Sequence, residues 1–141
     1  MKVLDPKNII TGLPSEPRDD AIRRCGHLLA DSGYVGDDYI EGMVRRNRST
    51  SVAIGNAIAI PHGENADKDK ILHTGLCVLT YPDGIDWDGQ QVKLVIGIAA
   101  QGDEHMDFLV RIAETFADEA VVHQVCSDAG AERIYELLGD K

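Results

Sequence analysis

The sequence predicts a single-domain α/β protein in which one mixed β-sheet is flanked by helices on both faces. Segments with helical periodicity lie at both ends of the chain, and strand-like runs lie between them. The 141 residues suffice for one hydrophobic core, and no Pro-, Gly- or Ser-rich linker divides them. We therefore expect residues 1–141 to form one domain, with too few βα alternations for a barrel.

Two helices are expected in the first third of the chain. Arg18–Ser32 carries its apolar residues on one helical face, and Gly33 is a suitable C-terminal stop. A second helix should begin at Asp37 or Asp38, because either side chain can accept hydrogen bonds from the free N–H groups of a first turn.

The expected strands are Asn8–Thr11, Ser51–Ile60, Thr74–Thr80 and Val92–Ala100. Pro61 should end the second of these because proline cannot donate to a β-ladder. The turn-forming sequence Tyr81–Gly84 should end the third. Val92–Ala100 is nearly all apolar, which is typical of a strand covered on both faces. Helical periodicity returns over residues 104–116, Glu119–Cys126 and Ala131–Leu138.

Charge and composition exclude several classes of protein. The chain has 24 acidic and 14 basic residues, giving a formal net charge of −10, which argues against a nucleic-acid binder. No apolar run approaches the roughly 20 residues of a membrane-spanning helix, and the first ten residues do not resemble a signal peptide. The three widely spaced cysteines are expected to be reduced. Together these features predict a cytoplasmic protein.

His62 occupies a distinctive position in Ile58-Ala59-Ile60-Pro61-His62-Gly63, where a buried strand ends. Pro61 stiffens the backbone before the histidine, and Gly63 permits tight geometry after it. Loops at strand ends are where α/β folds usually place function. His62 is therefore a candidate functional residue, and a hydrogen-bonded loop histidine is the alternative.

His105 lies at the start of the expected helix 104–116, in line with Leu109 and Ile112 on the buried stripe. A helix N-terminus offers free N–H groups to an anion and disfavours a protonated imidazole. A structural histidine at the edge of the core is the alternative for this residue.

The second helix is followed by a basic cluster that contains Arg45, Arg46 and Arg48. Such clusters usually complement the negative end of a helix dipole, but an arginine can also bind a phosphoryl group through two parallel hydrogen bonds.

Other familiar chemistries have little support. The chain has no GxxxxGK[ST] loop, no GxGxxG after a strand and no GxSxG turn. His62 and His105 both lie near glutamates, so a metal-dependent hydrolase remains an alternative, but no HExxH or HxH spacing supports a metal site. We expect no metal and no cofactor.

Gly55-Asn56-Ala57-Ile58-Ala59-Ile60-Pro61-His62-Gly63 resembles the active-site segment of the type-2 enzyme IIA domains of the bacterial phosphoenolpyruvate-dependent sugar phosphotransferase system. The likeness runs from about Asn8 to Leu138. Lys93–Ala100, followed by Glu104-His105, is more similar to the mannitol branch than to the nitrogen-related regulatory branch. The chain departs from the mannitol branch at Asn56, where that branch carries an acidic residue. The resemblance implies that this departure removes a charge next to the phosphate site.

The resemblance implies a phosphocarrier. It implies that His62 takes a phosphoryl group from the phosphohistidine of HPr through Nε2 and passes it to a cysteine of a sugar-specific IIB, itself linked to a membrane IIC. The second active-site histidine would be His105, as a hydrogen-bond donor, and the phosphate-binding arginine would be Arg46. Mannitol or a related hexitol is the expected sugar. A nitrogen-branch regulatory protein, whose phosphorylation switches partner binding, is the alternative.

Overall fold

The computed structural model of the chain describes residues 2–102, 104–127 and 130–139. Its strands form one five-stranded sheet in the order β1-β4-β5-β3-β2, with β1 at Ile9–Ile10, β2 at Ala53–Gly55, β3 at Ile58–Ala59, β4 at Gly75–Trp87 and β5 at Gln90–Ala99. β1 is parallel to β4 and β3 is parallel to β5, while the β4–β5 and β2–β3 pairs are antiparallel. The mixed sheet expected from the sequence is therefore confirmed.

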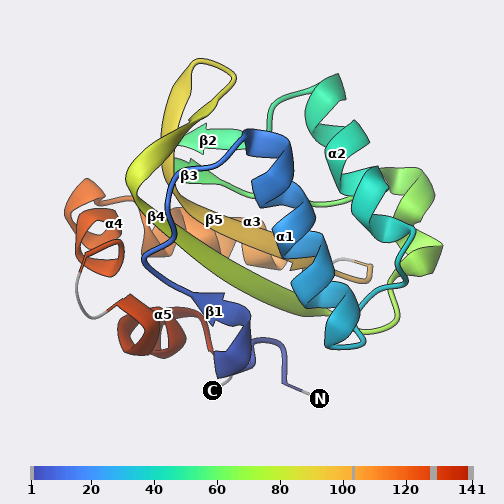
Figure 1. Cartoon of the computed structure of the whole chain (residues 1–141). Helices are drawn as coiled ribbons and strands as arrows, with labels where there is room; N and C mark the ends of the chain where they lie inside the picture. The colour runs from blue at the N-terminus through green and yellow to red at the C-terminus, as the bar shows by residue number, and fades with distance from the viewer. Residues whose placement is uncertain (1, 103, 128–129, 140–141) are drawn as a thin grey trace.

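Helices cover both faces of the sheet, as predicted. They are α1 (Arg18–Asp31), α2 (Tyr39–Ser49), α3 (Glu104–Thr115), α4 (Glu119–Val125) and α5 (Gly130–Leu138), with short 3₁₀ turns η1 (Pro6–Asn8) and η2 (Asn65–Lys70). Figure 1 shows α1 in front of β4 and β5, and α3 behind them. Within the described ranges, no helix has both the length and the apolar character needed to cross a bilayer.

The core is built around β5, in which every residue from Leu94 to Ala99 is buried. A strand with both faces covered needs this near-continuous apolar sequence. All three cysteines are buried and free, which agrees with the expected reduced thiols. Gly33, with a φ of +82°, ends α1 as expected, because the N–H of Tyr34 then bonds back to the carbonyl of Leu29. Asp38 stands at the N-cap of α2, but its side chain makes no capping hydrogen bond.

The prediction of one strand over Ser51–Ile60 was wrong. This segment folds into the β2–β3 hairpin, whose turn places Asn56 and Ala57 at φ values of 53° and 64°. Residues other than glycine adopt this left-handed conformation only rarely, so the turn carried no recognisable signal.

The prediction of a turn at Tyr81–Gly84 was also wrong. β4 continues through these residues to Trp87, because Thr80 pairs with Leu94 while Ile85 pairs with Val92, and the extra residues between them bulge out of the ladder. Pro82 is tolerated in this bulge, where no ladder hydrogen bond is needed. The chain reverses instead at Asp88-Gly89, where both φ values are positive.

Candidate active site

The backbone around His62 is held rigidly where β3 leaves the sheet. The carbonyl of Pro61 accepts a hydrogen bond from the N–H of Ile98 at 2.9 Å. On the other side of His62, the backbone N–H of Gly63 donates to the Tyr39 hydroxyl at 2.8 Å. This hydroxyl in turn donates to the carbonyl of Ile98 at 3.1 Å. His62 is thereby fixed from both sides to the end of β5.

The Tyr39 ring packs directly against the backbone of Gly63. A Cβ atom at residue 63 would lie 2.6 Å from the Tyr39 ring, so only glycine fits beneath it. Burial raises the pKa of Tyr39 to about 12, which keeps its hydroxyl protonated and able to donate. Local sequence does not reveal this link, because Tyr39 and Gly63 are distant in the chain and meet only in the fold.

The imidazole of His62 is held in one tautomer. Its Nδ1 lies 2.7 Å from the carbonyl oxygen of Ile60, and because a carbonyl can only accept, Nδ1 carries the hydrogen. Burial lowers the pKa of His62 to about 4; the Ile60 hydrogen bond opposes this effect, and the nearby His105 and Arg46 add to it. At neutral pH the ring is therefore uncharged, with the lone pair on Nε2.

His105 faces His62 from the first turn of α3. The two ring centroids are 4.8 Å apart, and the ring planes are inclined by 59°. Burial lowers the pKa of His105, and the positive charges of Lys68 and Arg46 lower it further, so this ring is also neutral at pH 7 and has one N–H available to donate. Asp103, just before this turn in the sequence, lies outside the described residues.

The position of His105 is fixed by the residues around the start of α3. Glu104 accepts a hydrogen bond from the Thr74 hydroxyl at 2.9 Å, and the same hydroxyl accepts one from the backbone N–H of Gln101 at 3.2 Å. The start of α3 is thus tied to the loop before β4.

The structure separates the three arginines of the basic cluster. Arg45 is directed at the carboxylates of Glu64 and Asp67, and Arg48 lies 3.7 Å from Asp19. Arg46 instead lines the pocket with His62, and its Nη1 donates to the carbonyl of Thr50 at 2.9 Å.

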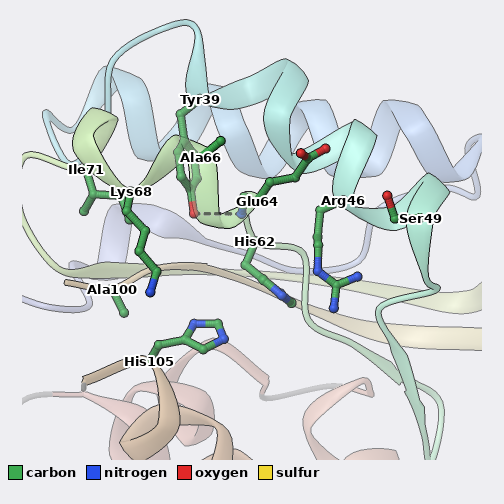
Figure 2. A pocket seen from close by; sticks show the side chains of 11 residues that line it. Tyr39, Arg46, Ser49, His62, Glu64, Ala66, Lys68, Ile71, Ala100 and His105 are labelled. Carbon is green, nitrogen blue, oxygen red and sulfur yellow. Dashed lines mark hydrogen bonds between the residues drawn. The ribbon is translucent and has the colours of Figure 1, made fainter. Parts of the chain in front are cut away.

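These side chains converge on one pocket of about 490 Å³. Figure 2 shows Arg46 beside His62, His105 across from it, and Lys68 reaching in from η2 on the side away from Arg46. The three candidates from the sequence are therefore brought together. Lys68 was not among them, because its approach depends on how η2 folds over the pocket. Among the described residues, no group of three or more His, Cys, Asp or Glu side chains is arranged to hold a metal ion.

Asn56 does not lie next to this pocket, contrary to the sequence-based expectation. It occupies the β2–β3 turn, and its amide donates to the carbonyls of Phe116 and Ala117, both at 3.1 Å, beyond the C-terminal end of α3. His105 is at the other end of that helix. Residues 56 and 62 lie on either side of the extended strand β3, and six residues of extended chain span about 20 Å, so Asn56 is carried away from His62.

The chain matches the model of the family described as "Phosphoenolpyruvate-dependent sugar phosphotransferase system, EIIA 2" over residues 2–141. The chain belongs to this EIIA 2 family. It is 39% identical over 138 residues to the mannitol-specific phosphotransferase enzyme IIA component of Halalkalibacterium halodurans, covering 98% of this chain and 95% of that protein. The protein of the same name in Staphylococcus aureus is 41% identical over 131 residues, 93% of this chain and 91% of that one.

Solved EIIA structures show the same fold. The enzyme IIA of mannitol from Escherichia coli, solved in complex with phosphorylated enzyme IIB of mannitol, superimposes with a TM-score of 0.87 at 32% identity, over 94% of each chain. The nitrogen regulatory protein IIA of Neisseria meningitidis superimposes with a TM-score of 0.81 at 20% identity, over 96% of each chain, a likeness of fold alone. This EIIA chain is thus a component of a phosphotransferase system.

Proposed function

We propose that this EIIA chain carries phosphoryl groups on Nε2 of His62, accepting them from the phosphohistidine of HPr and passing them to a cysteine of a mannitol-specific IIB. The observation that carries the proposal is the facing pair of neutral histidines, with ring centroids 4.8 Å apart, in a pocket that also contains Arg46. We take the whole chain, residues 1–141, as the IIA domain.

The tautomer of His62 suits it to be the nucleophile. The Nε2 lone pair forms the new N–P bond while the donor N–P bond breaks, and the electron pair of the broken bond stays on the donor nitrogen. With phosphorus on Nε2 and hydrogen on Nδ1, the ring becomes cationic. The carbonyl of Ile60, 2.7 Å from Nδ1, stabilises that charge and keeps the proton in place. The cationic ring is then a good leaving group for transfer onward to a thiolate.

His105 and Arg46 are assigned to charge compensation. Phosphoryl transfer requires in-line positioning and stabilisation of charge on the equatorial oxygens more than it requires further covalent chemistry. The neutral His105 donates its N–H to these oxygens, and the Arg46 guanidinium supplies a permanent positive charge. No step of this mechanism uses a metal or a cofactor.

The sugar and the partners are inferred from the relatives. Two relatives about 40% identical over nearly the whole chain are named for mannitol, whereas the nitrogen regulatory neighbour shares only 20% identity. The Escherichia coli neighbour, whose partner in its solved complex is a phosphorylated IIB, supports a IIB acceptor here. We propose that this IIB is linked to a membrane IIC and that the chain works in the cytoplasm, where HPr would reach it.

The experiment that tests this function follows one phosphoryl group. The chain is incubated with phosphoenolpyruvate, enzyme I and HPr, and then mixed with a mannitol IIB and a fructose IIB from the same cell. We expect one phosphoryl group on the chain and faster transfer to the mannitol IIB. Transfer to the fructose IIB at an equal or higher rate would contradict the sugar assignment. Phosphorylation followed by transfer to no IIB would favour the regulatory alternative.

A further inference from the structure

One cationic side chain at the pocket, that of Lys68, has no role in the mechanism above. Lys68 lines the pocket with His62 and His105 but forms no ion pair with any described residue. A cation that faces two neutral histidines rather than a carboxylate is suited to an anionic ligand.

The turn that carries Lys68 is held by its neighbour, Asp67. The buried carboxylate of Asp67 accepts hydrogen bonds from the backbone N–H of Glu64 at 3.0 Å and from the ammonium of Lys70 at 2.9 Å. It packs on α2 so closely that a Cβ atom at Gly42 would lie 2.1 Å from its Oδ2.

These contacts determine which of the cations around η2 are paired with a carboxylate. Asp67 engages Lys70 and Arg45, which lies 3.4 Å away, and thereby leaves Lys68 free to point into the pocket. In Figure 2 the ammonium of Lys68 lies on the His105 side of the pocket, while the Arg46 guanidinium lies beside His62. The two cations thus approach the space between the histidines from opposite sides.

We infer that Lys68 is a further catalytic residue, whose ammonium binds the phosphoryl oxygens during transfer to and from His62. This inference rests on the proposed phosphocarrier function. Arg46 is tethered to the carbonyl of Thr50 and serves as a fixed charge. Lys68 is exposed and has a flexible four-carbon stem, so its ammonium can follow the phosphoryl group as it moves from donor to carrier to acceptor. Burial is the main reason that the pKa of His105 is lowered, and the positive charge of Lys68 lowers it further.

The test compares Lys68→Met, Lys68→Arg and the control Lys7→Met. Methionine keeps the length of the side chain and removes its charge. Lys7→Met changes the net charge equally at an exposed site that does not line the pocket. Single-turnover transfer from phospho-HPr is measured for each folded variant, together with the NMR titration of His105 in the unphosphorylated protein.

We expect Lys68→Met to slow transfer about fivefold, equivalent to about 1 kcal/mol and modest because the ammonium is exposed. Lys68→Arg should stay within about twofold of the wild type, and Lys7→Met should match it. The pKa of His105 should rise in Lys68→Met alone, a change that a purely structural role would not produce. The inference is overturned if Lys68→Met transfers at the wild-type rate, if Lys7→Met is equally slow, or if Lys68→Arg fails to restore the rate. A wild-type chain that takes no phosphoryl group would instead refute the proposed function itself.

Discussion

The hydroxyl of Tyr39 accepts a hydrogen bond from the backbone N–H of Gly63 at 2.8 Å, and this contact joins α2 to the residue that follows His62. Because the same hydroxyl donates to the carbonyl of Ile98, one side chain satisfies two backbone groups at the end of the sheet. The orientation of His62 therefore depends on a residue from a different element.

Tyr39→Phe should remove both hydrogen bonds while keeping the packed ring. Leaving buried backbone groups unsatisfied costs about 1–3 kcal/mol, so we expect a loss of that order in the free energy of unfolding, measured with urea. Phosphotransfer should slow as well, because the segment that holds His62 is loosened. Tyr135→Phe is the matched control, since the Tyr135 hydroxyl makes no hydrogen bond to the described residues. Equal stability of the two variants would show that the Tyr39 hydroxyl contributes nothing.

Ala57→Gly should stabilise the protein. Ala57 has a φ of 64°, a conformation that costs a residue with a Cβ about 1–2 kcal/mol. Glycine relieves this strain but loses more entropy on folding, so we expect a net gain of about 0.5–1 kcal/mol. A higher urea midpoint with an unchanged m-value would support this expectation, and a lower midpoint would refute it. The rate of phosphotransfer should not change, because Ala57 does not line the pocket.

Asn56→Asp should lower the stability of the protein without slowing phosphotransfer. The amide of Asn56 donates to two carbonyls beyond the end of α3, and a carboxylate cannot donate to them. We expect a loss of about 0.5–1.5 kcal/mol in the free energy of unfolding, because Asn56 is exposed and water can replace part of what is lost. Transfer from phospho-HPr should stay within about twofold of the wild type under conditions where the variant is folded. A large loss of transfer in the folded variant would show that residue 56 does act on the pocket.

The pH dependence of stability should carry a contribution from His62. Between pH 6.5 and about 4 the unfolded chain protonates this ring while the folded chain keeps it neutral. The unfolded state then binds more protons, so stability falls as the pH drops through this window, by up to about 3 kcal/mol from this residue. His62→Gln should lose that part of the pH dependence, as measured by urea unfolding at several pH values. Identical pH profiles for the two proteins would contradict the depressed pKa.

Local patterns were enough to predict most of the fold. The helix α1 and the strand β5 carry strong periodic or continuous apolar signals, so their limits were predicted to within one or two residues. The β2–β3 turn could not be predicted, because Asn56 and Ala57 adopt left-handed conformations without a glycine in either position. The continuation of β4 past Pro82 was missed because it depends on pairing with β5, which local sequence does not show.

The candidate site also contains residues that local sequence reveals and residues that only the fold reveals. His62 stands out because Pro61 and Gly63 flank it at the end of a strand, and His105 because it opens a helix. The selection of Arg46 from three neighbouring arginines depends on which carboxylates engage the other two. The position of Lys68 at the pocket depends on the packing of Asp67 against α2, which is a contact between residues distant in the sequence.

The central claim is that His62 carries the phosphoryl group and that His105 only stabilises its charge. Losing one hydrogen bond to a charged group costs about 1.5–3 kcal/mol, equivalent to a rate loss of about 10- to 150-fold if it is felt in the transition state. We therefore expect His105→Ala to transfer slowly but still gain a phosphoryl group, and His105→Gln, which keeps an N–H donor, to be less impaired.

Intact-mass measurement of His62→Ala and His105→Ala after exposure to phospho-HPr tests this division most directly. The account predicts no phosphoryl group on His62→Ala and one on His105→Ala, with both variants folded by circular dichroism. One phosphoryl group on His62→Ala and none on His105→Ala would reverse the two roles and contradict the account.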